Sequence, residues 1–244
     1  MGVTIPGTTV CGVPLAAAIG AFGGDPQKGL KTLEDITPRH VEMAQKLIAN
    51  NAVDIAVEET PDFIHLDLTL SAGENCCRVV VKGTHTNVVE LYINGQPQPL
   101  SEKQNTRTQR ETLPTFSLQQ AYEFINRVDF NDIRFILDAA RLNSALAAEG
   151  KTKKYGLNIN GTFSDAVKNG LMSNDLLSKV IINTVAASDA RMGGAPVVAM
   201  SNFGSGNQGI TATMPVVVVA DHLGVDEETL ARALSLSHLT AISI

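Results

Sequence analysis

Aromatic residues are scarce in this sequence. They make up 5% of the 244 residues, and tryptophan is absent. The core therefore has to be built from Val, Ile, Leu and Ala. Hydrophobic residues make up 44% and charged residues 18% of the chain, which excludes wholesale disorder. This length suits one large domain or two small ones with a substantial core.

Clusters of Lys and Arg are also scarce: 19 basic residues stand against 25 acidic ones, the formal net charge is -6, and the only basic knot, Lys151-Thr152-Lys153-Lys154, follows a predicted helix end, where cations suit the helix dipole. A surface that binds phosphates needs such clusters, so we expect no nucleic acid partner. The longest fully apolar run, from Met214 to Ala220, is far shorter than the roughly 20 residues of a membrane-spanning helix. The first residues also lack the pattern of a secretory signal. We therefore expect no membrane association.

Cysteine is rare as well. Cys11, Cys76 and Cys77 cannot form a paired disulfide framework, which favours reduced thiols and a cytoplasmic protein. Cys76 and Cys77 are neighbours in a predicted strand, so their side chains point to opposite faces and cannot jointly bind a metal. We expect Cys11 to be buried as a small apolar side chain. The histidines show no metal-ligand spacing, so the sequence predicts no metal site in this chain.

Two periodicities predict an α+β fold, with a helical core and an inserted small antiparallel sheet of three to four strands. Residues 1–50 are expected to form an extended segment and helices. Residues 51–114 are expected to form the sheet and a polar loop from Gln96 to Pro114. Residues 115–244 are expected to form a helical region that carries a glycine-rich loop.

The predicted elements follow from local patterns. Alternating or β-branched residues between turn residues predict strands at 53–57, 63–70, 78–82 and 88–93. Apolar residues at helical spacing, most of them behind capping residues, predict helices at 14–22, 37–51, from 117, at 129–150, at 174–192 and from 226.

Glycine and small polar residues gather between residues 191 and 209. Gly204, Gly206 and Gly209 allow a ligand to approach the main chain. Backbone N–H groups ahead of a helix can bind a carboxylate or a phosphate. Spacing alone leaves a ligand loop and a glycine-rich turn between buried elements about equally supported. The residues between the glycines supply hydroxyl and amide groups: Ser205, Asn207 and Gln208.

The stretch from Gly204 to Gly209 also fits the G-x-G-x-x-G pattern of dinucleotide sites. That fingerprint needs a strand before it, a full helix after it and an acidic residue about 20 positions later. Here Pro215 interrupts early, and the valines of 216–219 follow too soon for a crossover helix. We therefore expect no nucleotide site.

Three segments carry a resemblance to a known family: Met1-Gly2-Val3-Thr4-Ile5-Pro6-Gly7-Thr8, Asp189-Ala190-Arg191-Met192-Gly193-Gly194, and the run from Ser201 to Gly209. Over its whole length the chain resembles the L-cysteine desulfidase family and, more distantly, the alpha chain of iron–sulfur L-serine dehydratase. The resemblance implies a lyase with a [4Fe–4S] cluster that converts L-cysteine to pyruvate, sulfide and ammonia. A donor-rich loop would bind the substrate α-carboxylate, and we assign this role to Ser205, Gly206, Asn207, Gln208 and Arg191. We assign no catalytic residue.

The cluster ligands of such enzymes do not map onto this chain. Family members carry one cluster cysteine in a Gly-Cys-Thr-Glu-Pro motif before the matching segment and the others beyond it, and Cys11, Cys76 and Cys77 fall in neither place. We therefore expect an internal fragment of the parent enzyme, without cluster or lyase activity of its own.

Two alternatives to the desulfidase activity stay open at the level of the sequence. The first is an L-serine dehydratase-like deaminase, which differs in the leaving group. The second is a small-molecule-binding regulatory module in which the strand region 53–93 holds an amino acid. The sequence also leaves open a homo-oligomer.

Overall fold

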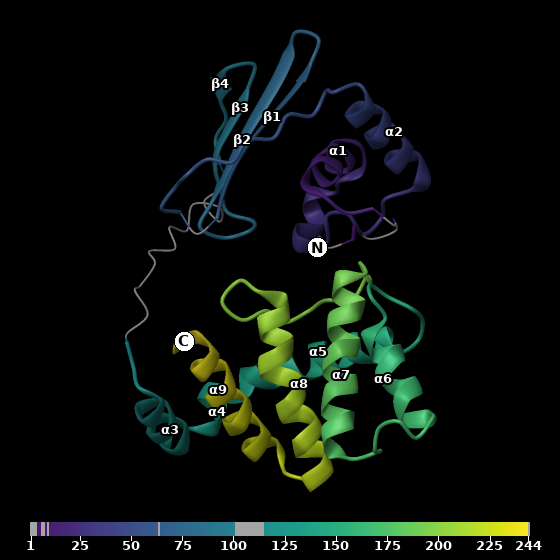
Figure 1. Cartoon of the computed structure of the whole chain (residues 1–244). Helices are drawn as coiled ribbons and strands as arrows, with labels where there is room; N and C mark the ends of the chain where they lie inside the picture. Colours follow the sequence, from purple (N-terminus) through teal and green to yellow (C-terminus); the bar gives the residue numbers. More distant parts are fainter. Residues whose placement is uncertain (1–3, 6–7, 9, 63, 101–114, 244) are drawn as a thin grey trace. The chain divides into compact units, whose positions relative to one another are not determined.

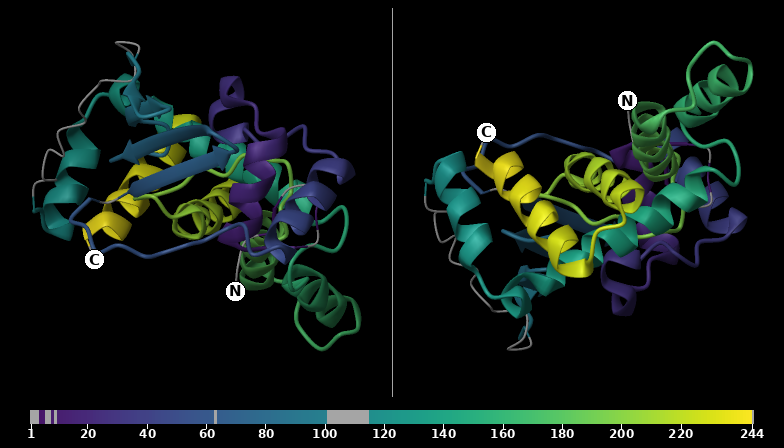
Figure 2. Two further views of the ribbon diagram at one scale, coloured as in Figure 1. Left: turned by 90° about the horizontal axis from the view of Figure 1, so that it is seen from above. Right: turned by 90° about the horizontal axis from the view of Figure 1, so that it is seen from below.

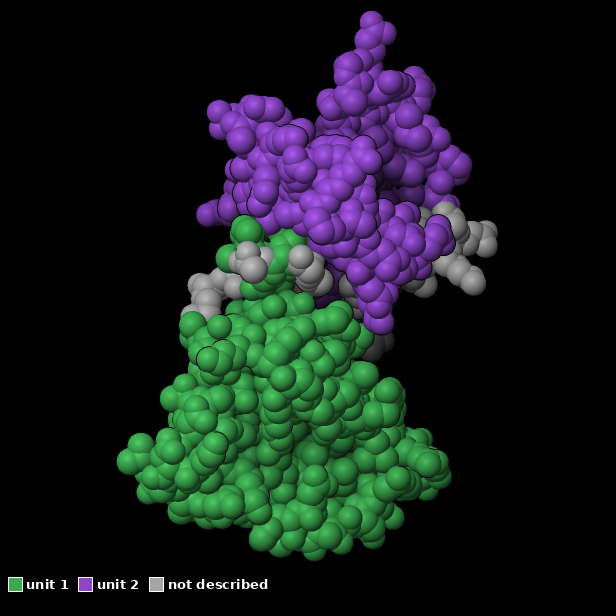
Figure 3. All heavy atoms as spheres, turned by 90° about the vertical axis from the view of Figure 1, so that its right-hand side faces the viewer, with its two compact units in different colours: residues 1–12, 114–244 green, residues 13–113 purple. Residues whose placement is uncertain are grey.

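The computed structural model of the chain describes residues 4–5, 8, 10–62, 64–100 and 115–243 (Figure 1). It confirms the predicted α+β fold, which is mainly helical and contains one small antiparallel sheet. The chain divides into two compact units, one of residues 1–12 and 114–244 and the other of residues 13–113 (Figure 3). The three-part division of the sequence at residues 50 and 114 stays a prediction.

The larger unit is a helical bundle. Helix α7 packs against α5, α6 and α8, and α8 lies between α7 and α9 (Figures 1 and 2). None of the helices in the described residues is long and apolar enough to cross a membrane. The elements of this unit are α3 (Leu118–Arg127), α4 (Phe130–Ile133), the 3-10 turn η3 (Arg134–Ile136), α5 (Leu137–Gly150), α6 (Ile159–Lys168), α7 (Leu176–Met192), α8 (Gly206–Leu223) and α9 (Glu227–Ser243).

Small residues allow the helices of this bundle to pack closely. Ala186, Ala187 and Ala190 on α7 are fully buried. At Gly150, the last residue of α5, an added Cβ would lie 2.0 Å from the Ala186 carbonyl oxygen. Backbone thus meets backbone where α5 ends on α7, and small residues permit this close approach in a core poor in aromatic residues.

Most predicted helix starts in this unit are confirmed by their capping bonds. Ser117 Oγ accepts from Gln120 N (3.2 Å), and Gln120 Oε1 accepts from Ser117 N (2.8 Å), which is the predicted capping box. The predicted helix 129–150 is broken by η3 into α4 and α5. Helix α6 was not predicted, because its first turn is capped from a distance rather than locally: Asp189 of α7 accepts from Asn160 N (2.9 Å).

Among its described residues, the smaller unit holds two α-helices, one 3-10 helix and the sheet. The strands pair antiparallel in the order β1-β2-β3-β4. Helix α2 begins behind Thr37, as predicted, and Thr37 Oγ1 accepts from His40 N (3.4 Å). The elements are α1 (Val13–Gly23), the 3-10 helix η1 (Pro26–Lys31), α2 (Pro38–Ala49), β1 (His65–Ala72), β2 (Asn75–Lys82), β3 (Val88–Ile93) and β4 (Gln96–Pro97).

Two local predictions in this part of the sequence are wrong. Residues 53–57 form no strand, and Val57 is 96% exposed; alternation makes a strand only where a partner strand is available to pair with it. Cys11 is exposed rather than buried and forms an isolated bridge with Thr4. Phe63, residues 101–114 of the predicted loop, and residues 1–3, 6–7 and 9 of the extended segment lie outside the described residues.

Candidate functional site

Helix α8 begins inside the glycine-rich stretch. It starts at Gly206 and runs through Pro215 to Leu223, so the prediction that Pro215 and the following valines end the helix is wrong. Proline removes one N–H donor from a helix, and here the packing of α8 against α7 and α9 outweighs that loss. A helix thus follows the G-x-G-x-x-G pattern, but within the described residues no strand precedes it, as a dinucleotide site would require.

A tight turn leads into α8. Asn202 N donates to Ser205 O (3.1 Å), and Ser205 N donates to Asn202 O (2.9 Å). The two residues between them, Phe203 (φ 47°) and Gly204 (φ 80°), both have positive φ, as in a type I′ turn. The turn folds the chain back so that Ser205 becomes the N-cap of α8.

The first turn of α8 has open backbone donors. Ser205 Oγ accepts from Gln208 N (3.3 Å), which satisfies one of the N–H groups at the start of the helix. In the part of the chain that the structure describes, the N–H groups of Gly206 and Asn207 have no acceptor. The Ser205 hydroxyl keeps its own hydrogen available for donation.

The Arg191 guanidinium lies against this open helix end. Arg191 is the penultimate residue of α7 and is half-buried. Its Nη1 donates to Asn207 Oδ1 (3.2 Å), which also accepts from Ser188 Oγ (3.4 Å). An added Cβ on Gly206 would lie 2.1 Å from Arg191 Nε. A glycine at position 206 is therefore what allows the guanidinium to reach the helix end.

No carboxylate neutralises this guanidinium among the described residues. The neighbouring acid in the sequence, Asp189, is buried and accepts instead from Asn160 N (2.9 Å) and Nδ2 (3.1 Å). The end of α7 favours a cation, but the start of α8 adds positive partial charge beside it. Together, the guanidinium and the open N–H groups form a setting that attracts an anion.

The structure brings four of the five predicted site residues together. Ser205, Gly206 and Asn207 form the start of α8, and Arg191 contacts it from α7. The side chain of Gln208 is engaged elsewhere, because its Nε2 donates to Ala241 O of α9 (2.8 Å).

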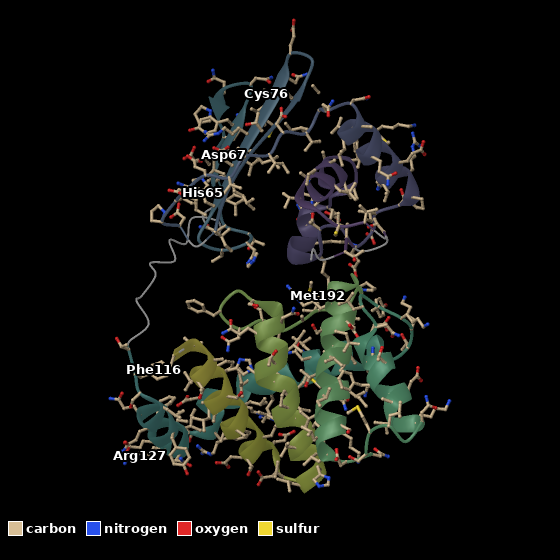
Figure 4. The ribbon with its side chains drawn as sticks, in the orientation of Figure 1. His65, Asp67, Cys76, Phe116, Arg127 and Met192 are labelled. Carbon is tan, nitrogen blue, oxygen red and sulfur yellow. The ribbon has the colours of Figure 1, made fainter. Side chains whose placement is uncertain are left out.

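Two contacts at this site were missed from the sequence. Met192, the last residue of α7 and labelled in Figure 4, contacts Arg191 Nη1 through its sulfur (3.3 Å). Ser188 was also missed, although its position three residues before Arg191 puts both side chains on one helix face.

The cysteines do not fit a [4Fe–4S] cluster. Such a cluster takes four thiolates, and the chain has three cysteines. Cys76 and Cys77 are consecutive in β2 and face opposite sides of the sheet, and Cys11 belongs to the other unit. Among the described residues, no group of three His, Cys, Asp or Glu side chains could hold a metal ion.

Comparison with known proteins places this chain in a family. Residues 27–244 match the family described as serine dehydratase alpha chain. A UPF0597 protein of Klebsiella pneumoniae is 98% identical over 244 residues, and one of Chromobacterium violaceum is 45% identical over 245 residues. The UPF0597 protein YhaM of Salmonella gallinarum is 45% identical over 250 residues.

These alignments cover 100% of this chain but only 57% of each relative. The chain thus spans little more than half the length of the curated relatives that it matches. No solved structure matches it. Because the family match extends over residues 27–244, the chain belongs to the serine dehydratase alpha chain family.

Proposed function

We propose that this chain carries the carboxylate-binding part of a lyase that cleaves L-cysteine to pyruvate, sulfide and ammonia. In this proposal the activity belongs to a longer protein of the length of the matched relatives, of which this chain covers 57%. In this proposal Arg191, Ser205 and the N–H groups of Gly206 and Asn207 bind the substrate α-carboxylate.

One observation carries the proposal: the guanidinium of the half-buried Arg191, which pairs with no carboxylate of the described residues, lies at the open start of a helix. Burial of a cation is costly unless a counter-charge compensates it. An α-carboxylate supplies that charge and can accept from both the guanidinium and the helix N–H groups. The membership of this chain in the serine dehydratase alpha chain family agrees with an amino acid as the ligand.

The carboxylate contacts would orient the substrate for elimination. With the carboxylate held, the Cα–H bond and the Cβ–S bond take fixed directions relative to the protein. Elimination removes the Cα proton and releases sulfide from Cβ, which leaves aminoacrylate. Aminoacrylate tautomerises to its imine, with Cβ gaining a proton and the nitrogen losing one, and water then hydrolyses the imine to pyruvate and ammonia. The residues described here bind and orient the substrate, and we assign the Cα base to none of them.

The [4Fe–4S] cluster that we propose for the longer protein is bound outside this chain. Three cysteines spread over two units do not form its ligand set. The 244-residue chain alone is therefore expected to assemble no cluster. Anaerobic incubation with iron and sulfide tests this, because a stoichiometric cluster absorbance on the isolated chain would contradict it.

The sheet offers a weaker anion site than the start of α8. Its arginine, Arg78, already binds two carboxylates, since Nη2 lies 2.6 Å from Asp67 Oδ2 and Nη1 lies 3.4 Å from Glu90 Oε2. Asp67 in turn has its pKa lowered, chiefly by its hydrogen bond with Arg78. Because this cation is neutralised internally, the amino-acid-binding role that the sequence left open for the sheet has less support than the α8 site.

The test uses the full-length Klebsiella relative, purified without oxygen, with substitutions at the positions that match this chain. We expect Arg191→Met to raise KM for L-cysteine by roughly 10- to 100-fold, since a hydrogen bond to a charged group is worth about 1.5–3 kcal/mol. Arg141→Met is the matched control, because Arg141 lies on the surface of α5 and, within the described part of the chain, pairs with Asp138 alone. An unchanged KM in Arg191→Met would refute the assignment.

The leaving group is tested on the same protein. We expect a higher kcat/KM for L-cysteine, measured by sulfide release, than for L-serine, measured by pyruvate formation. The reverse ratio would identify the protein as an L-serine deaminase with the same carboxylate site.

A further inference from the structure

A buried polar network lies beneath the turn that leads into α8. Asn143 in the middle of α5 and Thr213 in α8 are both fully buried, and His238 of α9 is 8% exposed. The predicted site contains none of these side chains. Each of them contacts the backbone or a side chain of the segment 200–213.

Asn143 binds both sides of one residue in that segment. Its Oδ1 accepts from Met200 N (2.9 Å), and its Nδ2 donates to Met200 O (3.3 Å). A side-chain amide has one acceptor and a donor group in the arrangement that such a pair of bonds needs. Asp lacks the donor and Leu lacks both, so this position requires an amide.

The Met200 backbone is in direct contact with the first turn of α8. An added Cβ on Gly209 would lie 2.1 Å from Met200 O and 2.8 Å from Asn202 N. The Asn143 Nδ2 group also lies within hydrogen-bonding distance of Gly209 O (3.4 Å) and Thr213 Oγ1 (3.2 Å). One amide therefore fixes the segment before the turn and the helix start relative to each other.

The Thr213 hydroxyl connects this amide to α9. Its oxygen lies 2.7 Å from Gly209 O, a distance at which the single hydroxyl hydrogen has to be donated to the carbonyl. His238 Nε2, 3.0 Å from the same hydroxyl, is then the donor. The His238 carbonyl accepts from Asn202 Nδ2 (3.1 Å) and so holds the turn a second time.

We infer that Asn143 is a positioning residue for the carboxylate site, with Thr213 and His238 as its partners. It sets where the N–H groups of Gly206 and Asn207 lie without touching the ligand. This inference rests on the proposed function of the α8 start. A carboxylate site at a helix end can be only as rigid as the buried groups that hold that helix end in place.

The test combines two measurements on the full-length relative. We expect Asn143→Asp to raise KM for L-cysteine by about tenfold, and to speed amide hydrogen exchange at Met200, Asn202 and Ser205. Ile125→Ala is the control for a purely structural effect, because Ile125 is buried on α3, which packs against α9, and it lies outside the apolar cluster that contains Ile210 and Met214 of α8. It should lower thermal stability while leaving KM and the exchange at these three amides unchanged.

A second pair of variants keeps the inference testable if Asn143→Asp fails to fold. Thr213→Val keeps the shape of the side chain but removes its hydroxyl, so we expect it to raise KM. Thr213→Ser keeps the hydroxyl, so we expect a KM close to that of the wild type. Unchanged KM and exchange in Thr213→Val would overturn the inference. If Arg191→Met still raises KM in that case, the proposed function stands and only the positioning role fails. A wild-type protein without lyase activity would overturn both, even where Asn143→Asp speeds exchange.

Discussion

Replacing Gly206 by alanine should separate ligand binding from stability. Gly206 is the first residue of α8, and its φ is not positive, so an alanine can adopt its backbone conformation. The new methyl group, however, would lie 2.1 Å from Arg191 Nε and 2.8 Å from Arg191 Cζ. These atoms belong to the far end of a flexible side chain, so the guanidinium can move away and the backbone need not.

The two effects on stability partly offset each other. Alanine is favoured over glycine in a helix by up to about 1 kcal/mol, and the displaced guanidinium loses its bond to Asn207 Oδ1, worth about 1.5–3 kcal/mol. We therefore expect the free energy of unfolding to fall by only about 0.5–2 kcal/mol. Carboxylate binding loses its guanidinium, which corresponds to a KM raised by roughly 10- to 100-fold.

Gly209→Ala provides the contrast. Its methyl group would lie 2.1 Å from the Met200 carbonyl oxygen, which is backbone and cannot swing away. This variant should lose both stability and binding. Denaturation by guanidinium chloride and steady-state kinetics on the full-length protein separate the two cases. A Gly206→Ala protein with normal KM, or one as unstable as Gly209→Ala, would refute the reasoning.

Three further predictions concern stability. Gly150→Ala places a methyl group 2.0 Å from the Ala186 carbonyl and should lower the free energy of unfolding by about 1–3 kcal/mol or more, measured by chemical denaturation. Gly20→Ala in α1 meets no atom within 4 Å and should raise it by about 0.5–1 kcal/mol in the same assay. Burial lowers the pKa of His238 from its ordinary 6.5, so the unfolded chain binds this proton first as the pH falls. The stability that neutral His238 provides is therefore complete above about pH 6.5 and decreases as the pH falls towards the folded-state pKa. The decrease in the free energy of unfolding from about pH 7 to about pH 5, measured by urea denaturation, should be smaller in His238→Gln than in the wild type.

Local signals in the sequence predicted much of the fold. Ser117 and Thr37 stand at the helix starts that their capping patterns indicate, and residues 88–93 form a strand with the predicted bounds. These features depend on residues within one turn or one hairpin. The predictions failed where distant partners decide the outcome, as for the unpaired segment 53–57 and for α6, which is capped by Asp189.

The candidate site was predictable in composition but not in arrangement. The glycines of 204–209 indicated a close approach to the main chain, and Gly206 and Gly209 do have such approaches, to Arg191 and Met200. The sequence could not show that α8 starts inside the motif, because Pro215 argues against a helix there. It also could not show that Asn143, 57 residues before Met200, binds this segment.

Inhibitor binding tests the proposed Arg191–carboxylate contact most directly. 3-Mercaptopropionate carries a carboxylate without the amine, and cysteamine carries the amine without the carboxylate. We expect Arg191→Met in the full-length relative to raise the inhibition constant of 3-mercaptopropionate by roughly 10- to 100-fold and to leave that of cysteamine unchanged. Equal changes for both inhibitors, or no change for either, would contradict the account.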